Sequence, residues 1–389
     1  MLPKPAAMSS VVLICEVNLG MGHITRMLIL ASALARGFRV MLIVVTAESL
    51  QIEAPPGVEI HILNRPLVPA LSGFRNVGLK MLELVRNTKP VAAIVEYFPF
   101  GRHASVFYLL PFFKGLRSIG EGNVKVLCSI RDIQDCKLEA LKADSVVRLL
   151  NENFDGVLVH SDPAMTRLED TFTADAPISV PVYYTNYVSR HACNSYTPLR
   201  KSNTILVSAG GGRGGEALLR CAATAAKSGL LRGYHVRILA GKLLLDPDWN
   251  DLVDICSGPG DPVELLRWLP DLFTELKAAA VSVSRCGYNT TQDLLASRVP
   301  ALVVPIATPT EDEQLQRAAI LSQGGFIRML KESDMTPDSL AAEILRTVNF
   351  RPAAITAKLD GAQRTFEIIS ALTAGNETAE LLRSVSART

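Results

Sequence analysis

The sequence contains no block of lysine and arginine, and its net charge at pH 7 is only +2. Binding of nucleic acid depends on a concentrated basic surface, so we expect no nucleic-acid partner. An apolar run long enough to cross a bilayer is also missing. The apolar stretch near the N-terminus is interrupted by Glu16 and Asn18, which favours a first β-strand over a secretory signal.

Cysteine pairs at redox or zinc spacing are absent as well. The seven cysteines are odd in number and scattered, a usage typical of reduced thiols in a cytoplasmic protein. A peripheral position at the inner face of a membrane stays open. The six histidines do not pair at metal-ligand spacing, so we predict no metal.

The 389 residues, 48% of them hydrophobic and 20% charged, indicate a well-packed chain of two or three domains. Short apolar runs alternate with amphipathic helical patterns, which predicts an α/β fold with parallel sheets. This alternation of strands and helices occurs in two successive series. The strands are expected at 11–15, 40–46, 91–96, 124–129 and 156–160, and then at 205–208, 236–240, 254–258, 281–284 and 301–305. We therefore predict domains over 1–195 and 196–355, with terminal helices in 356–389 that pack back on the first domain.

A glycine turn follows the first predicted strand, and His23 stands at the start of the helix after it. An imidazole titrates near neutral pH, so His23 could act as a general base. The alternative is a histidine that only hydrogen-bonds the turn. A dinucleotide fingerprint is disfavoured, because its third glycine would fall at Thr25 and because His23 and Arg26 would crowd a pyrophosphate.

A second glycine loop follows the strand 205–208. Glycines let a ligand approach backbone N–H groups closely, so Gly210, Gly211 and Gly212 are candidates for binding a diphosphate. Arg213 could neutralise its charge. The alternative is a flexible turn with a solvated arginine.

The stretch 281–325 is the most informative part of the chain. After a short strand, a turn at Cys286–Gly287 opens a helix whose first N–H groups suit a diphosphate. The residues predicted to contact a nucleotide sugar here are Arg285, Gly287, Asn289, Thr290, Thr291, Asp293, Glu313 and Gln314. Gly287 would contribute its backbone.

This stretch resembles the donor-binding half of GT-B glycosyltransferases, above all the family that adds N-acetylglucosamine to the lipid-linked peptidoglycan precursor. The family pattern S-R-x-G-x-x-T-x-x-E, then D/E-Q-x-x-N-A, has its counterparts in 284–293 and 313–318. Two positions depart from it: Asp293 replaces a longer glutamate, and Arg317 replaces an asparagine.

The resemblance implies a GT-B architecture, with two doubly wound Rossmann-like domains facing across a cleft. It further implies an inverting, metal-independent transfer from a nucleoside-diphosphate sugar, a UDP-sugar in that family, to a hydroxyl acceptor. Asp293 would then hold the ribose, while Glu313 and Gln314 would orient the sugar. The nucleotide sugar is a co-substrate, so no cofactor is predicted.

The first domain is expected to hold the acceptor, which the sequence leaves unidentified as a small metabolite, a polysaccharide or a lipid-linked molecule. Its candidate contacts are Gly20, Gly22, Arg26, Glu96 and His103, of which Glu96 and His103 could also assist His23. The aromatic and basic stretch 98–117 has two interpretations, a buried helix with a basic end or a peripheral membrane contact.

Two other functions stay open. The segment from Gly20 to Arg26 also resembles the G-x-G-H-x-x-R loop of GT-B-fold sugar-nucleotide hydrolases of nonulosonic acid biosynthesis, in which the histidine activates water. The additional first-domain sequence over 98–131 and 135–203 favours a transferase, because it could hold a second substrate. A sugar-nucleotide-binding protein without activity is the third class.

Overall fold

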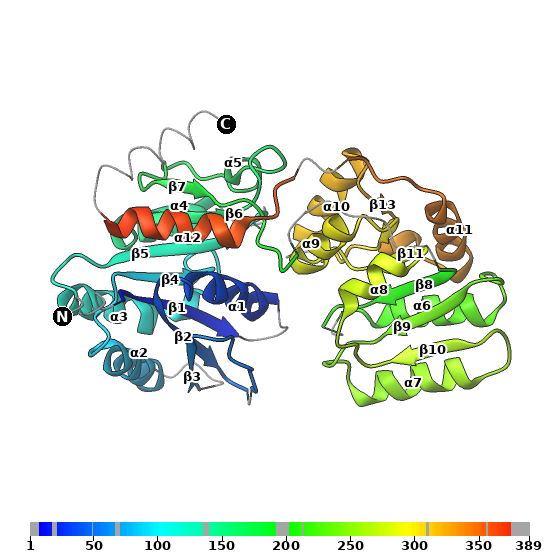
Figure 1. The fold of residues 1–389 in the computed structure, drawn as a ribbon, viewed down its shortest axis with the longest axis horizontal. Coiled ribbons are helices and arrows are strands. Elements are labelled where there is room, and N and C mark those ends of the chain that lie inside the picture. The colour runs from blue at the N-terminus through cyan, green and yellow to red at the C-terminus, as the bar shows by residue number, and fades with distance from the viewer. Residues whose placement is uncertain are drawn as a thin grey trace, which may run out of the picture. The chain divides into compact units, whose positions relative to one another are not determined.

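The computed structural model describes residues 8–17, 22–48, 50–66, 71–134, 140–191, 202–211, 214–308, 311–354 and 357–374. The chain divides into two compact units. The first unit comprises Met1–Ser189 together with Asp360–Thr389, and the second comprises Arg190–Leu359. Each unit is an α/β structure built on one parallel sheet (Figure 1). Two doubly wound α/β units were predicted from the sequence, and this is confirmed.

The first unit has a seven-stranded sheet of order β3-β2-β1-β4-β5-β6-β7. Its strands are β1 (Ser10–Val17), β2 (Arg39–Thr46), β3 (Val58–Asn64), β4 (Ala92–Glu96), β5 (Lys125–Arg131), β6 (Gly156–His160) and β7 (Val182–Tyr184). Its helices are α1 (Gly22–Leu34), α2 (Leu71–Val85), η1 (His103–Ser105), α3 (Val106–Ile119), α4 (Ala140–Asn153), α5 (Leu168–Thr171) and α12 (Gly361–Ala374).

The inner strands of this sheet, β2, β1, β4, β5 and β6, are buried on both faces, as near-continuous apolar runs require. Along β1, Val12 and Ile14 face a hydrophobic cluster built with α2, α3 and α4. Val11 and Leu13 face the opposite cluster, built with α1 and α12. The period-2 alternation of a strand thus feeds two cores on either side of one sheet.

Helix α12 packs against α1 in the first unit (Figure 1). The ring of Phe366 meets Phe38 edge to face with 5.9 Å between centroids. Arg36 Nη2 donates to Gln363 Oε1 at 2.6 Å. Gly37 makes this approach feasible, because a Cβ there would lie 2.8 Å from the Phe366 ring. A chain segment distant in sequence therefore completes the first core.

The second unit has a six-stranded sheet of order β10-β9-β8-β11-β12-β13. Its strands are β8 (Thr204–Ser208), β9 (His235–Leu239), β10 (Val263–Leu266), β11 (Val281–Ser284), β12 (Ala301–Val303) and β13 (Arg328–Met329). Its helices are α6 (Glu216–Lys227), α7 (Asp246–Ser257), α8 (Leu272–Ala278), α9 (Tyr288–Ser297), α10 (Glu313–Gln323), η2 (Glu332–Asp334) and α11 (Pro337–Val348).

One predicted strand is wrong. Residues 254–258, expected as a strand, mostly form the last turn of α7, and the strand paired with β9 is β10. The two adjacent apolar residues of this stretch, Ile255 and Cys256, fit a short strand and a helical turn equally well. Pro247 at the start of α7 presets the helical backbone, and the helix then continues through the run to Ser257.

The strand orders place one topological switch point in each sheet. In the first unit the chain runs outward from β1 to β2 and β3, then returns to β4 on the other side of β1. In the second unit the same reversal falls between β8 and β11. Open α/β sheets bind ligands at the carboxyl ends of strands at such points.

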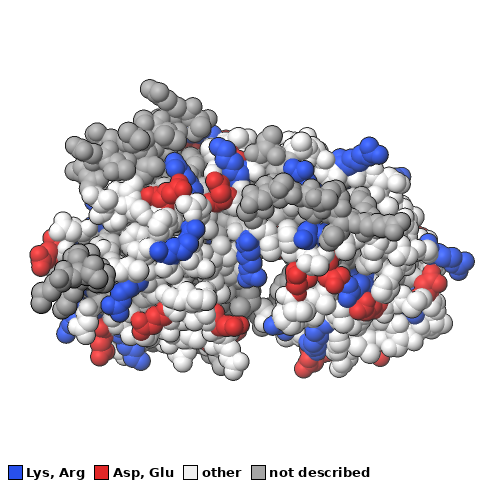
Figure 2. All heavy atoms as spheres, in the orientation of Figure 1, with Lys and Arg blue, Asp and Glu red and all other residues white. Residues whose placement is uncertain are grey.

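The described residues include no helix that is both long and apolar enough to span a membrane. On the face shown in Figure 2, basic and acidic side chains are interspersed over the described residues. That mixture agrees with a net charge of only +2.

Candidate functional site

His23 and Glu96 meet at the switch point of the first sheet. Helix α1 begins at Gly22, so His23 stands in its first turn, and Glu96 is the last residue of β4. His23 Nδ1 lies 2.6 Å from Glu96 Oε1. The Glu96 side chain is fully enclosed, whereas that of His23 is 16% exposed. The imidazole is therefore reachable from outside, and the carboxylate beneath it is not.

A third group, Arg26, binds the same carboxylate oxygen. Arg26 Nη2 donates to Glu96 Oε1 at 2.5 Å, and the arginine is fully buried. The sequence placed Arg26 on the acceptor side, together with Gly20 and Gly22. Gly22 opens α1, and Gly20 lies outside the described residues.

Electrostatics set the protonation states of this cluster. Burial alone would raise the pKa of Glu96, but His23, Arg26 and Arg131 outweigh it and lower that pKa to about 2. The pKa of His23 is lowered, first by burial and then by Arg131 and Arg26, against the opposing pull of Glu96. At neutral pH Glu96 is therefore a carboxylate and His23 a neutral imidazole.

These states fix the tautomer of His23. A carboxylate only accepts hydrogen bonds, so Nδ1 of His23 carries the proton that it donates to Glu96. Nε2 is then the unprotonated nitrogen. A neutral histidine oriented by a buried carboxylate is the arrangement of a general base.

An aromatic side chain lies beside His23. The Tyr97 ring centroid is 5.5 Å from that of His23, and the Arg131 guanidinium at the end of β5 lies 5.3 Å from the Tyr97 ring. Tyr97 has a left-handed backbone with a φ of 64°. A Cβ at residue 101 would come within 2.2 Å of the Tyr97 ring, so only Gly101 fits there.

His103 is not brought to this cluster. It is exposed at the start of η1, and hydrogen bonds of the cluster join Glu96 to His23 and to Arg26 instead. Glu96, which the sequence marked as a lesser candidate for assisting His23, is its direct partner.

The neighbouring stretch 98–117 is mostly core. Phe98, Tyr108, Phe112 and Phe113 are all buried, and Arg117 at the end of α3 binds Asp155 and the carbonyl of Asn153. The burial of these aromatic side chains agrees with the interpretation of the stretch as a buried helix. Phe107, 46% exposed, is the large aromatic of α3 that faces outward.

In the second unit, the two predicted donor loops meet at the switch point. Gly210, in a left-handed conformation with a φ of 65°, follows β8, and a Cβ there would lie 3.9 Å from Thr290 Oγ1. Gly287 precedes α9 and offers no side-chain cap to the first-turn N–H groups. Backbone amides of a helix start thus lie beside a glycine loop, the usual environment of a bound phosphate. Gly212 and Arg213 lie outside the described residues.

The hydroxyl and carboxyl groups predicted on α9 differ in exposure. Thr290, Asn289 and Asp293 are half-buried, whereas Thr291 is buried with its Oγ1 3.6 Å from Cys286 Sγ. Burial raises the pKa of Asp293 to about 6, while the nearby charge of Arg190 acts in the opposite direction.

Several other predicted donor residues hold the protein's own loops. Arg285 is buried and donates to the carbonyls of Val304 and Gly214 at 3.0 and 2.8 Å, and it pairs with Glu332 at 2.6 Å. These contacts tie the turn after β11 to the end of β12.

Gln314 and Arg317 also support the turn after β11. Gln314 Oε1 accepts from the backbone N–H of Cys286 at 3.1 Å, and Arg317 Nη1 donates to the Cys286 carbonyl at 2.9 Å. Glu313 lies 3.9 Å from Arg317. The motif of α10 thus fixes the shape of the loop that opens α9.

Sequence reasoning missed Trp268. It follows β10 at the carboxyl edge of the second sheet, it is 54% exposed, and Lys242 Nζ lies 3.9 Å from its ring. A tryptophan two residues after the short, mostly apolar run of β10 was the available signal. It was overlooked because the strand was expected at 254–258 and not at β10.

An aspartate-x-aspartate triplet, Asp246-Pro247-Asp248, opens α7. Asp246 pairs with Arg267 at 2.7 Å and Asp248 with Arg220 at 2.8 Å. Both carboxylates therefore have arginine partners within the protein.

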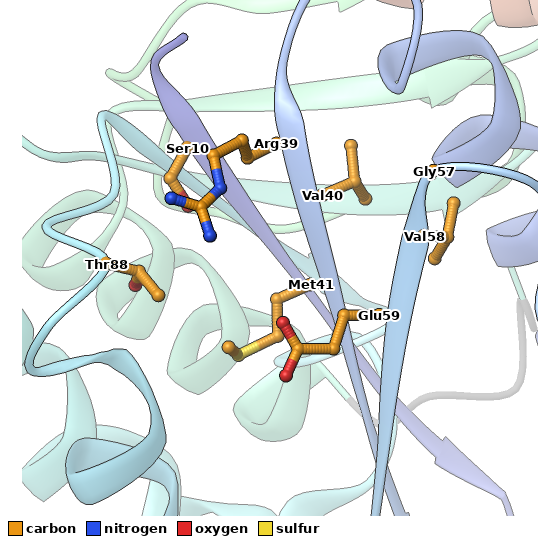
Figure 3. Close-up of a pocket in the computed structure, with 8 residues that line it drawn as sticks. All are labelled: Ser10, Arg39, Val40, Met41, Gly57, Val58, Glu59 and Thr88. Atoms are coloured by element: carbon orange, nitrogen blue, oxygen red, sulfur yellow. The ribbon is translucent and has the colours of Figure 1, made fainter. Parts of the chain in front are cut away.

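A hollow of about 450 Å³ lies elsewhere on the first unit (Figure 3). Its lining residues include Ser10, Arg39 and Val58, the first residues of β1, β2 and β3. Glu96 ends β4 at the opposite, carboxyl edge of the same sheet. The hollow is therefore separate from the His23 site.

Comparison with solved structures identifies the architecture as the GT-B fold of glycosyltransferases. The chain resembles a structure described as "Crystal structure of acinetobacter baumannii MurG" with a TM-score of 0.57 and 15% identity over 98% of this chain and 100% of that one. It also resembles "TcCGT1 in complex with UDP", with a TM-score of 0.62 and 13% identity over 98% and 99% of the two chains.

Residues 204–370 match the glycosyltransferase family 28 C-terminal domain. Similar proteins are the "UDP-N-acetylglucosamine--N-acetylmuramyl-(pentapeptide) pyrophosphoryl-undecaprenol N-acetylglucosamine transferase" of two organisms. The Methylobacterium radiotolerans protein is 35% identical over 102 residues, 26% of this chain and 27% of its own length. The Synechococcus elongatus protein is 28% identical over 189 residues, which are 48% of this chain and 51% of its own length. The matches thus span about a quarter to a half of these relatives, and the predicted resemblance is confirmed.

Proposed function

We propose that this protein is an inverting, metal-independent glycosyltransferase that moves a sugar from a UDP-sugar to a hydroxyl group of an acceptor. The observation that carries the proposal is the His23–Glu96 pair, with Nδ1 2.6 Å from a buried carboxylate. The match of residues 204–370 to a glycosyltransferase domain supports sugar transfer as the reaction.

In the proposed reaction, His23 Nε2 takes the proton of the acceptor hydroxyl as its oxygen attacks the anomeric carbon. The new C–O bond forms while the bond from that carbon to the diphosphate breaks, and UDP leaves with the bonding electron pair. Glu96 stabilises the imidazolium that results, because its carboxylate faces Nδ1. Displacement from the opposite side inverts the anomeric centre.

The second unit binds the donor in this proposal. First-turn N–H groups of α9 and the backbone of Gly210 and Gly211 meet the negative charge of the diphosphate without a metal. Asp293 accepts hydrogen bonds from the ribose, and Glu313 contacts the sugar. Gln314 contributes through its amide N–H groups, since its Oε1 accepts from Cys286.

For the acceptor, we propose a lipid-linked molecule at the inner face of a membrane. The relatives named above are described as acting on a pyrophosphoryl-undecaprenol substrate. The outward-facing Phe107 offers this protein one apolar contact.

The test is to incubate the protein with UDP- and dTDP-sugars carrying a labelled sugar and to follow nucleotide release with and without a lipid extract of cells. Release that depends on the extract, with label in its lipid fraction, supports the transferase. Equal release in plain buffer as free sugar identifies the hydrolase, in which His23 would deprotonate water. No release under either condition contradicts both.

Because Trp268 is exposed at the carboxyl edge of the second sheet, we propose that it stacks on the base of the donor. Replacing it by alanine is expected to weaken binding of a UDP-sugar by roughly tenfold, because stacking of a base on an aromatic ring contributes about 1–3 kcal/mol. Calorimetry measures the Kd. Leu245→Ala, which removes another exposed apolar side chain of the second unit, is the control and should leave the Kd unchanged. Equal affinities for both variants would remove Trp268 from the donor site.

Affinity for the donor is expected to fall as the pH drops below about 6, because Asp293 has a pKa raised to about 6. Above that pH the carboxylate can accept two ribose hydrogen bonds, whereas the protonated form accepts less well. A UDP-sugar is suitable because its phosphates do not titrate in this range. The Kd is measured by calorimetry in a His23→Ala background without acceptor, in which turnover is slowed.

Asp293→Asn should bind more weakly near neutral pH and lose the pH dependence. Asp338→Asn, at the exposed start of α11, should retain it. A pH profile that is identical with and without the Asp293 carboxyl group would show that another group titrates.

A further inference from the structure

His23 and Arg26 bind Glu96 from the same helix. They are three residues apart on α1 and therefore share one face of it. The two bonds converge on one oxygen, Glu96 Oε1, at 2.6 and 2.5 Å. The arginine and the glutamate are enclosed, and the histidine sits partly exposed. The cluster therefore combines a buried ion pair between Arg26 and Glu96 with a partly accessible imidazole.

A buried carboxylate is costly unless it is paired. If His23 were the sole partner of Glu96, the pair would be most stable with the imidazole protonated, and a protonated imidazole cannot accept a proton. Arg26 supplies a permanent positive charge to the same oxygen. The carboxylate is thereby neutralised while His23 stays uncharged.

The other titratable groups around the cluster, among the described residues, come from three strands. Burial first, and then the charge of Glu96, raise the pKa of the thiols of Cys15 on β1 and Cys128 on β5 well above their usual value. Burial lowers the pKa of His160 on β6 well below its usual value. All three are neutral near pH 7, which leaves Arg131 as the further charge acting on His23 and Glu96.

We propose that Arg26 is a positioning residue of the base: it holds the Glu96 carboxylate ionised and aimed at Nδ1, so that His23 rests as a neutral imidazole with Nε2 open. This inference deepens the proposed function and rests on it. It gives Arg26 a role different from acceptor binding, which suits a side chain that is 0% exposed.

The test compares Arg26→Met, which removes the charge, with Arg26→Lys, which keeps it. His23 is titrated by NMR in histidine-labelled protein, its signal being assigned by its absence in His23→Asn. The pKa of His23 should rise in Arg26→Met, since a cation that lowers it is gone, and it should return toward the wild-type value in Arg26→Lys. Arg39→Met is the control, because Arg39 is exposed at the opposite end of the strands.

Activity gives the second measurement. In Arg26→Met, kcat should fall roughly tenfold near pH 6.5 and much less near pH 8.5, because a larger share of His23 is protonated at the lower pH. The KM for the donor should stay the same. A merely structural role would lower kcat equally at all pH values and leave the His23 titration unmoved, and that outcome overturns the proposal.

Circular dichroism and thermal unfolding check that the variants fold, and Arg26→Gln replaces Arg26→Met if the latter does not. If neither neutral variant folds, the wild-type titration decides, and a His23 pKa above the usual value for histidine overturns the proposal. The titration requires no substrate. Absence of turnover with every donor would therefore contradict the proposed function and still leave the role of Arg26 measurable.

Discussion

Replacing His23 by alanine is expected to lower kcat for sugar transfer by roughly 10²–10⁴-fold, the usual contribution of a general base. The reason is that His23 is the partly exposed member of the cluster, and its neutral imidazole has Nδ1 hydrogen-bonded to Glu96. Donor affinity should stay within about twofold, since the proposed donor contacts all belong to the second unit, whereas His23 acts on the acceptor hydroxyl in the proposed reaction. Initial rates with a labelled UDP-sugar and calorimetry measure the two quantities.

His61→Ala is the matched control for this prediction. His61 lies on β3, where its Nε2 is 2.7 Å from Glu59, away from the carboxyl end of β4. Its removal should leave both kcat and donor affinity unchanged. Full activity of His23→Ala would remove the proposed base, and a loss of donor affinity equal to the loss of rate would assign His23 to binding and not to proton transfer.

The first unit shows how far the sequence predicts such a site. The strand ends and the glycine turn placed His23 and Glu96 at the carboxyl edge of one sheet. Which of the polar residues at that edge would touch His23 depends on the order of the strands, and β4 pairs directly with β1. Sequence periodicity carries no information on that order. Glu96 was accordingly only one of several candidates.

The buried position of Arg26 could not be predicted either. An arginine in the first turns of a helix is ordinarily solvated, and the ion pair with Glu96 offsets part of the cost of burying this one. The same limit applies to Arg285 and Gln314 in the second unit. Their polar groups satisfy backbone carbonyls and N–H groups of nearby loops, a demand that appears only once the turns are folded.

Glu96→Gln is the second change with a large expected effect, on the order of 10²-fold in kcat, because an amide stabilises the imidazolium poorly and fixes its tautomer less well. Its pH dependence is distinctive. Glu96 raises the pKa of His23, so its neutralisation should move the acidic limb of the kcat profile to lower pH. Loss of the Arg26 charge should move the same limb to higher pH.

General damage to the fold would hardly shift the acidic limb in opposite directions when Glu96 and its partner Arg26 are replaced in turn. Glu96→Gln also leaves Arg26 buried without its carboxylate, which typically costs about 3–5 kcal/mol in stability, so urea unfolding must accompany the kinetics. Glu96→Asp keeps the charge and serves as the second variant, with Glu59→Gln on β3 as the exposed control. If Glu96→Gln moves the acidic limb upward, or leaves kcat unchanged, Glu96 does not tune the base, and the electrostatic account of this cluster fails.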